Sequence, residues 1–151
     1  MNEKPDKPAL QQALVFDFGE RRIGVASANA LTGVAGELVT LNARKGQPQA
    51  DALDALLREW QPEVLVIGLP YNEDGSESPM TKRANEFAAW LGERYQLPTQ
   101  MVDERLTSAE AESILRSQRQ SGLRKRRTRK QDIDRLAARL IAESWLRGAG
   151  N

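Results

Sequence analysis

Acidic residues stand at three places in this sequence where a carboxylate could do chemistry. Asp17 lies within an otherwise apolar run, where an ionised carboxylate is costly to bury without a partner. Asp103 and Glu104 follow the end of another short run, and strand ends are where α/β proteins build their sites. Asp134 has alanines three and four residues further on, which would let its helix approach a sheet closely. Carboxylates that converge in this way suit a divalent cation such as Mg²⁺ or Mn²⁺.

Each of these acids also has an ordinary structural explanation. Asp17 could form a salt bridge with Arg21 or Arg22 or stabilise a turn near Gly19, and Glu104 could be a solvated loop acid. Neighbours in an extended chain point to opposite sides, so only one of that pair can readily join Asp17. The residues alone therefore leave the choice between Asp103 and Glu104 open.

A fourth acid, Asp132, is expected to play a structural part. At roughly 100° per residue it lies about 200° around the last helix from Asp134. Its place near the predicted helix start suits an N-cap. Asp132 is therefore not expected to share a site with Asp134.

The composition limits the chemistry further. The 151 residues contain no histidine and no cysteine, which excludes a Ser-His-Asp triad, a thiolate nucleophile and a cysteine zinc site. No run approaches the roughly 18 apolar residues that a membrane helix needs, and the first residues lack the apolar core of a signal peptide. We expect one soluble, cytoplasmic domain whose hydrolytic chemistry depends on acids and metal.

Basic residues are concentrated in one segment, although the net charge is only +1. Residues 116–130 contain no acid, and the rest of the chain is acidic on balance. We expect an exposed basic loop that contacts nucleic-acid phosphates, the alternative being a solvated or disordered tether. Its bases are Arg116, Arg119, Arg124, Lys125, Arg126, Arg127, Arg129 and Lys130.

Hydrophobic spacing predicts the elements that must position these side chains. Residues 1–12 should be a disordered lead-in, and residues 13–148 a single domain. Apolar runs predict strands at 13–18, 23–28, 33–41, 64–67 and 99–102. Helical spacing predicts helices over 53–60, from Ser78 to about Arg94, from a capping box at Thr107 and Glu110, and over 133–145. The order βββαβαβαα gives an α/β fold with a mixed five-stranded sheet flanked by helices: a three-stranded antiparallel meander plus parallel strands.

Four blocks in this order resemble the YqgF family. They are DFGERRIGVA at 17–26, GLP at 68–70, DERLT at 103–107 and IDRLAA at 133–138. The resemblance covers roughly residues 13–147. The family comprises bacterial RNase H-like proteins, described as Holliday junction resolvases and as nucleases that mature the 5′ end of pre-16S rRNA. The resemblance therefore implies an RNase H-like fold and a nuclease.

The resemblance also assigns roles by position. It implies that Asp17, Glu104 and Asp134 form a catalytic acidic triad that holds Mg²⁺ or Mn²⁺, with two ions roughly 3.5–4 Å apart in our hypothesis. Asn72, in the loop after the GLP block, is a candidate substrate contact, although we favour a simple β-turn as its explanation. Family members typically have Lys-Gly-X-Val-Asp where this chain has KQDID at 130–134. No proposed ligand is lost by this departure.

Two arginines flank the proposed site. Arg22 and Arg105 could orient a phosphate or stabilise the acids electrostatically, and we favour the second role. Both nevertheless remain candidate substrate-binding residues.

Three other functions compete with a pre-rRNA nuclease. The blocks equally suit a resolvase that acts on four-way DNA. A non-catalytic nucleic-acid-binding factor of ribosome assembly, in contact with ribosomal precursor particles, would keep the fold without turnover. An actin-like ATPase could use DFG at 17–19 as a phosphate loop, but 151 residues supply one lobe where that fold needs two.

Overall fold

The computed structural model describes residues 11–72, 74–103, 113–118 and 130–149. Its elements are the strands β1 (Gln12–Asp17), β2 (Arg22–Asn29), β3 (Val34–Arg44), β4 (Gln47–Pro48), β5 (Val64–Leu69) and β6 (Thr99–Asp103), and the helices α1 (Ala50–Trp60), α2 (Pro79–Tyr95) and α4 (Lys130–Ser144). A π-helical turn, Trp145–Ala149, continues α4. Residues 113–118 form a further short helix. No helix within these described ranges is long and apolar enough to cross a membrane.

The sheet is mixed, in the order β4-β3-β2-β1-β5-β6. Strands β1 to β4 pair antiparallel in sequence order, whereas β5 is parallel to both β1 and β6. The predicted meander followed by parallel strands is confirmed. The predicted number of strands is wrong, because the described residues form a sheet of six strands rather than five.

The additional strand, β4, is a two-residue edge strand that depends on a tight turn. Lys45 and Gly46 both have positive φ, 53° and 81°, as a two-residue hairpin turn requires. The turn folds Gln47 and Pro48 back onto the end of β3. Two residues, one of them proline, give no periodic pattern that the sequence analysis could detect.

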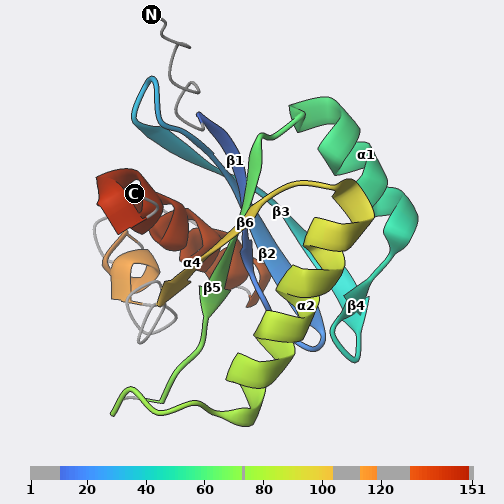
Figure 1. Ribbon diagram of the computed structural model, residues 1–151. Helices are drawn as coiled ribbons and strands as arrows, with labels where there is room; N and C mark the ends of the chain where they lie inside the picture. The colour runs from blue at the N-terminus through green and yellow to red at the C-terminus, as the bar shows by residue number, and fades with distance from the viewer. Residues whose placement is uncertain (1–10, 73, 104–112, 119–129, 150–151) are drawn as a thin grey trace, which may run out of the picture.

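Helices α1 and α2 lie on one side of the sheet and α4 on the other (Figure 1). Alternation along the strands accordingly divides the core into two layers. Leu14 and Phe16 of β1 join the cluster that packs against α1 and α2. Ala13 and Val15 point the other way, into the cluster beneath α4. Asp17 continues this alternation and therefore lies on the α4 side of the sheet.

Helix α2 begins where the sequence predicts. The Ser78 hydroxyl accepts a hydrogen bond from the Thr81 amide at 3.2 Å, and the Thr81 hydroxyl accepts one from the Ser78 amide at 2.9 Å, which completes a capping box. Both hydroxyls also donate to the carbonyl of Pro70, at 2.9 and 2.7 Å. The start of α2 thereby fastens the loop that follows β5.

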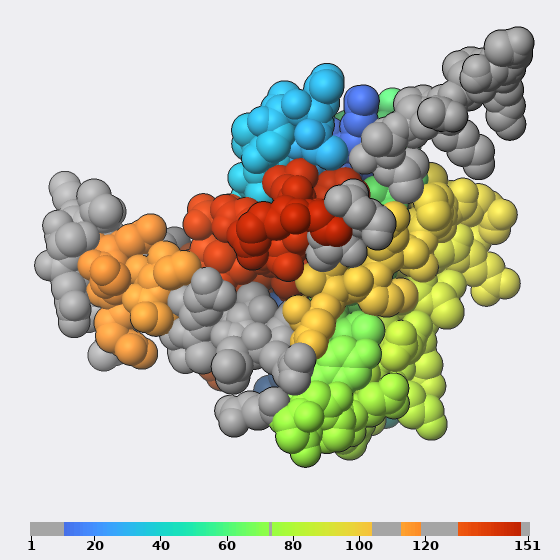
Figure 2. Space-filling model, turned by 60° about the vertical axis from the view of Figure 1, so that its left-hand side comes forward, coloured from blue at the N-terminus to red at the C-terminus, as the bar shows by residue number. Residues whose placement is uncertain are grey.

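Helix α4 crosses the other face of the sheet (Figure 2). It buries Ala138, Ile141 and Ala142 against the strands, and Leu136 and Ala137 pack on Leu115 of the 113–118 helix. In Figure 2 this helix is red and lies beside the orange residues 113–118.

Two predictions about the region before and at the start of α4 need correction. The basic segment is not a loop at its ends, because Arg116 belongs to the 113–118 helix and Lys130 begins α4. Asp132 is not an N-cap, because the helix starts two residues earlier. It is instead buried in the first turn, with Arg135 Nη2 at 2.6 Å from its Oδ1. Residues 1–10, the Thr107–Glu110 capping box and residues 119–129 lie outside the described part of the chain.

Candidate active site

Asp17 stands between two glycines on the α4 face of the sheet. It pairs with Gly24 in β2 and with Gly68 in β5. Residues that pair directly across neighbouring strands share a face, so both neighbours of Asp17 lack a side chain there. Glycine inside a strand commonly marks a place where another backbone or a ligand comes close.

At Gly24 the close neighbour is the backbone of Asp134. A Cβ on Gly24 would lie 2.0 Å from the carbonyl oxygen of Asp134 and 3.2 Å from its Cα, so helix and strand touch without an intervening side chain. The Cα atoms of an antiparallel pair are about 4.5–5.5 Å apart. Asp134 therefore rests on the strand position next to Asp17.

A hydrogen bond fixes the beginning of α4 over the same row of the sheet. Thr40 pairs with Gly24 from β3, and its hydroxyl donates to the carbonyl of Gln131 at 3.0 Å. Four paired residues thus form one row across the sheet: Thr40, Gly24, Asp17 and Gly68. The start of α4 is bonded to Thr40 at one end of this row, and Asp17 lies inside it.

Arg22 makes an ion pair with Asp134. Its Nε donates to Oδ2 of Asp134 at 2.8 Å, and the two side chains are 30% and 19% exposed. The pair occupies one oxygen of the carboxylate and holds it above the strand. This geometry agrees with the electrostatic role that we favoured for Arg22.

The register of β6 separates Asp103 from this site. Val102 pairs with Gly68 and lies in the α4 layer, whereas Asp103 pairs with Leu69, which belongs to the opposite layer. Asp103 therefore faces away from Asp17. Glu104 and Arg105 lie outside the described residues. Within the described ranges no three acids form a metal-binding group.

The described part of the loop after β5 supports the turn interpretation of Asn72. The Asn72 amide nitrogen of the side chain donates to Ser76 Oγ at 2.9 Å, and its backbone bonds to Ser76 and Gly75 close the turn. The residue is exposed at the same sheet edge as Asp17. A contact with substrate stays a prediction.

The basic candidates are only partly placed. Lys130 is exposed at the first position of α4, four residues before Asp134. Arg124, Lys125, Arg126 and Arg127 lie outside the described residues. A phosphate-binding role for these bases stays a prediction.

The sequence analysis missed the two glycines and the residues of a groove on the other face, among them Lys45, Arg83 and Trp90. Gly24 and Gly68 could have been noticed as glycines inside apolar strands. The groove residues gave no signal, because they come from separate elements.

Comparison with known proteins identifies the family. The RuvX family, described as "Holliday junction resolvase", matches residues 11–148. The chain belongs to the RuvX family. It is 46% identical over 143 residues to a protein of Pseudomonas paraeruginosa that is provisionally named a pre-16S rRNA nuclease, with 93% of this chain and 94% of that protein covered. A relative in Saccharophagus degradans with the same name is 41% identical over 137 residues, covering 91% and 94% of the two chains. RuvX is the YqgF family of the sequence analysis.

Solved structures support the RNase H-like fold. The yeast mitochondrial Holliday junction resolvase superposes with a TM-score of 0.54 at 14% identity, over 96% of this chain and 82% of that one. RuvC of Thermus thermophilus in complex with a Holliday junction gives 0.50 at 14% identity, over 92% and 97%. At these identities the likeness shows the fold alone.

Proposed function

We propose that this RuvX-family protein is a divalent-metal-dependent nuclease whose ligands are Asp17, Asp134 and Glu104. The observation that carries the proposal is the seating of Asp134 on Gly24, next to Asp17. A helix residue and a strand residue far apart in the sequence are brought to one place, and both residues that pair with Asp17 in the adjacent strands are glycines.

The described residues fit a cation of this kind. Carboxylate oxygens are the ligands that Mg²⁺ and Mn²⁺ prefer. Asp17 and Asp134 belong to neighbouring strand and helix positions, so their negative charges would repel each other, and Arg22 pairs with Asp134 alone. When bound, divalent cations lower the pKa of water and neutralise charge on the scissile phosphate and the leaving oxygen.

The remaining residues would orient the metal ligands and bind the substrate. Arg22 holds Oδ2 of Asp134, which leaves the other oxygen available as a ligand. Lys130 and the basic residues Arg124, Lys125, Arg126 and Arg127, together with Arg105, would attract the phosphates of the substrate. Asn72 would contact the strand from the loop after β5. These contacts position a strand without reading its sequence.

The names of the relatives favour RNA as the substrate. Proteins that match nearly their whole length to this chain are named pre-16S rRNA nucleases, so we propose 5′-end maturation of pre-16S rRNA. That role would place the protein in the cytoplasm with ribosomal precursor particles. The description of the family supports a second candidate, resolution of four-way DNA junctions.

One experiment separates these substrates. A pre-16S 5′-leader RNA and a four-way DNA junction are each incubated with the purified protein, with Mn²⁺ or with EDTA. We expect Mn²⁺-dependent cleavage of the leader RNA that Asp134→Asn abolishes. Cleavage of the junction alone would establish the second candidate. If the wild type and Asp134→Asn leave both substrates equally intact, the nuclease proposal is overturned and a binding role is favoured.

A further inference from the structure

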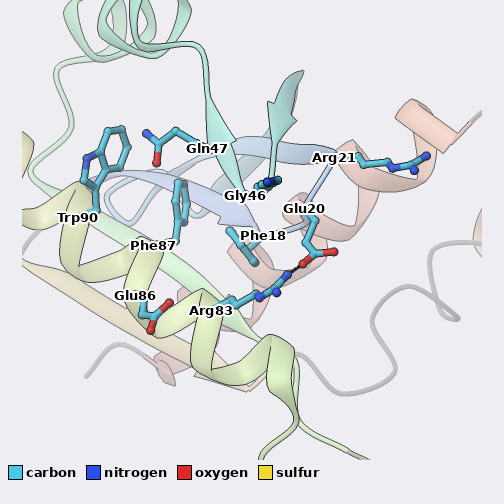
Figure 3. Close-up of a pocket in the computed structure, with 10 residues that line it drawn as sticks. Phe18, Glu20, Arg21, Gly46, Gln47, Arg83, Glu86, Phe87 and Trp90 are labelled. Atoms are coloured by element: carbon cyan, nitrogen blue, oxygen red, sulfur yellow. Dashed lines mark ion pairs between the residues drawn. The ribbon is translucent and has the colours of Figure 1, made fainter.

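A groove of about 660 Å³ lies beside the turn between β1 and β2, on the face opposite α4 (Figure 3). Its walls come from the end of β1, the β3–β4 turn and α2. Sites that take one small ligand commonly have volumes of about 300–1,000 Å³. The groove therefore has room for a nucleotide-sized ligand, and none of the proposed catalytic acids lines it.

Aromatic rings form the floor of this groove. Phe18, Phe87 and Trp90 are three of the eight aromatic residues of the chain. The Phe87 ring lies 5.2 Å from Phe18 and 6.1 Å from Trp90, centre to centre, and is within 25° of parallel to Trp90. The two phenylalanines are buried, whereas Trp90 is half-buried and accessible from the groove. Such a surface suits a nucleobase, since every base has a flat π-face.

Charged residues of both signs line the groove around the aromatic floor. Arg21, Lys45 and Arg83 are exposed lining residues, against two acids, Glu20 and Glu86. Arg83 pairs with Glu20 across the groove, while Arg21 extends away from the rings along the turn (Figure 3). Among the described residues no ion pair joins Lys45 or Arg21 to an acid. Lys45 is therefore the lining cation that an anionic ligand would contact first, and Arg83 would contact it only in exchange for Glu20.

The groove and the acidic site lie back to back at the end of one strand. Phe18 directly follows Asp17, yet belongs to the opposite core layer. The turn that separates the two sites carries Arg21, whose exposed guanidinium could neutralise a phosphate crossing it. A strand bound at Asp17 would have to cross this turn to reach the aromatic floor.

We propose that this groove binds one unpaired nucleotide of the substrate strand, on the opposite side of the sheet from the phosphodiester that is cut. Its base packs on Trp90, and its phosphate contacts Lys45 and Arg83, in competition with Glu20. A base stacked inside a duplex cannot reach such a floor, so the ligand is single-stranded. The inference rests on the proposed nuclease function and adds a strand-binding subsite to it.

Binding of a single-stranded hexauridylate with a 5′ fluorescein label, followed by anisotropy, tests this proposal. The full-length protein is used in EDTA, so that cleavage plays no part. We expect Lys45→Glu and Arg83→Glu each to weaken binding roughly tenfold, and Trp90→Ala at least roughly fivefold. Lys82→Glu, the same change on the exposed neighbour of Arg83 outside the groove, should weaken it less than twofold.

Three outcomes would overturn the subsite. Equal affinities of Lys45→Glu, Arg83→Glu and Lys82→Glu would show that the groove does not hold the strand. Competition by uridine 5′-monophosphate as effective as that of the hexamer would identify a free nucleotide as the occupant. A change in sedimentation mass in the groove variants, with unchanged anisotropy, would make the groove a contact between copies. If binding depends on the groove but no substrate is cut, the nuclease proposal fails and the groove stands.

Discussion

The carbonyl of Asp134 rests on Gly24, with a separation that leaves no space for even one methyl group. This contact couples the last helix to the centre of the sheet, because Gly24 pairs with Asp17. The proposed acids are held together by backbone packing rather than by long side chains. Small changes at Gly24 should therefore affect both the stability of the protein and its chemistry.

Gly24→Ala tests this packing. The added Cβ would lie 2.0 Å from the Asp134 carbonyl, so α4 must move away from the strand. We expect the free energy of unfolding in urea to fall by about 1–3 kcal/mol, and cleavage to be lost. Gly36→Ala is the matched control, because its Cβ would meet Ser27 Oγ at an ordinary 3.5 Å. Gly24→Ala with wild-type stability and activity would refute the close contact.

Arg22→Gln tests whether the ion pair positions Asp134. Partners that orient metal ligands typically contribute 10–100-fold to activity or metal affinity, and we expect a loss of about this size. The Mn²⁺ concentration for half-maximal cleavage should rise, while the free energy of unfolding changes by less than about 1 kcal/mol. Arg139→Gln breaks a comparably exposed pair with Glu37 further along α4 and should leave cleavage unchanged. Equal effects of the two substitutions would argue against positioning.

Ser78→Ala tests the cap of α2. It removes the acceptor of the Thr81 amide and the donor to the Pro70 carbonyl. The expected loss in the free energy of unfolding is about 1 kcal/mol, measured by urea titration. Ser78→Thr keeps a hydroxyl at the position and should recover most of this stability. An alanine variant as stable as the wild type would show that the cap contributes nothing.

The raised pKa of Tyr95 predicts that the free energy of unfolding falls at alkaline pH. Burial and a 2.5 Å hydrogen bond to Asp54 raise the pKa of the Tyr95 phenol from 10.0 to about 12. The folded protein thus holds this proton more tightly than the unfolded chain. The contribution is fully present below pH 10 and is lost as the pH rises through about 12. The stability advantage of the wild type over Tyr95→Phe should shrink across this interval, and a constant advantage would contradict the assignment.

Much of the fold could be predicted, because its central strands are apolar runs that are buried on both faces of the sheet. The buried strand β5 and the capped start of α2 are examples in which local residues determine the element. Strand β4 could not be predicted, since it exists only through the left-handed turn at Lys45. Asp132 was misplaced because α4 begins at Lys130, two residues before it, so Asp132 lies inside the first turn and pairs with Arg135 three residues further along the same helix.

Part of the candidate site could likewise be predicted from the sequence, and part could not. Asp17 and Asp134 could be named from the family resemblance and their apolar surroundings, and the structure places them over neighbouring strand positions. The contact through Gly24 could not be foreseen, because it depends on the angle at which α4 crosses the sheet. The aromatic groove was also hidden, since Phe18, Lys45 and Trp90 lie far apart in the sequence.

The most direct test of the central claim is a double-mutant comparison of Mn²⁺-dependent cleavage. Rates are measured for wild type, Asp17→Asn, Asp134→Asn and the variant that carries both, with Asp51→Asn as an exposed control. Residues that act as one unit give non-additive effects. We predict that each single substitution removes the Mn²⁺-dependent rate, that the double variant is no worse, and that the control is unaffected. Wild-type cleavage by Asp17→Asn or Asp134→Asn would contradict the account.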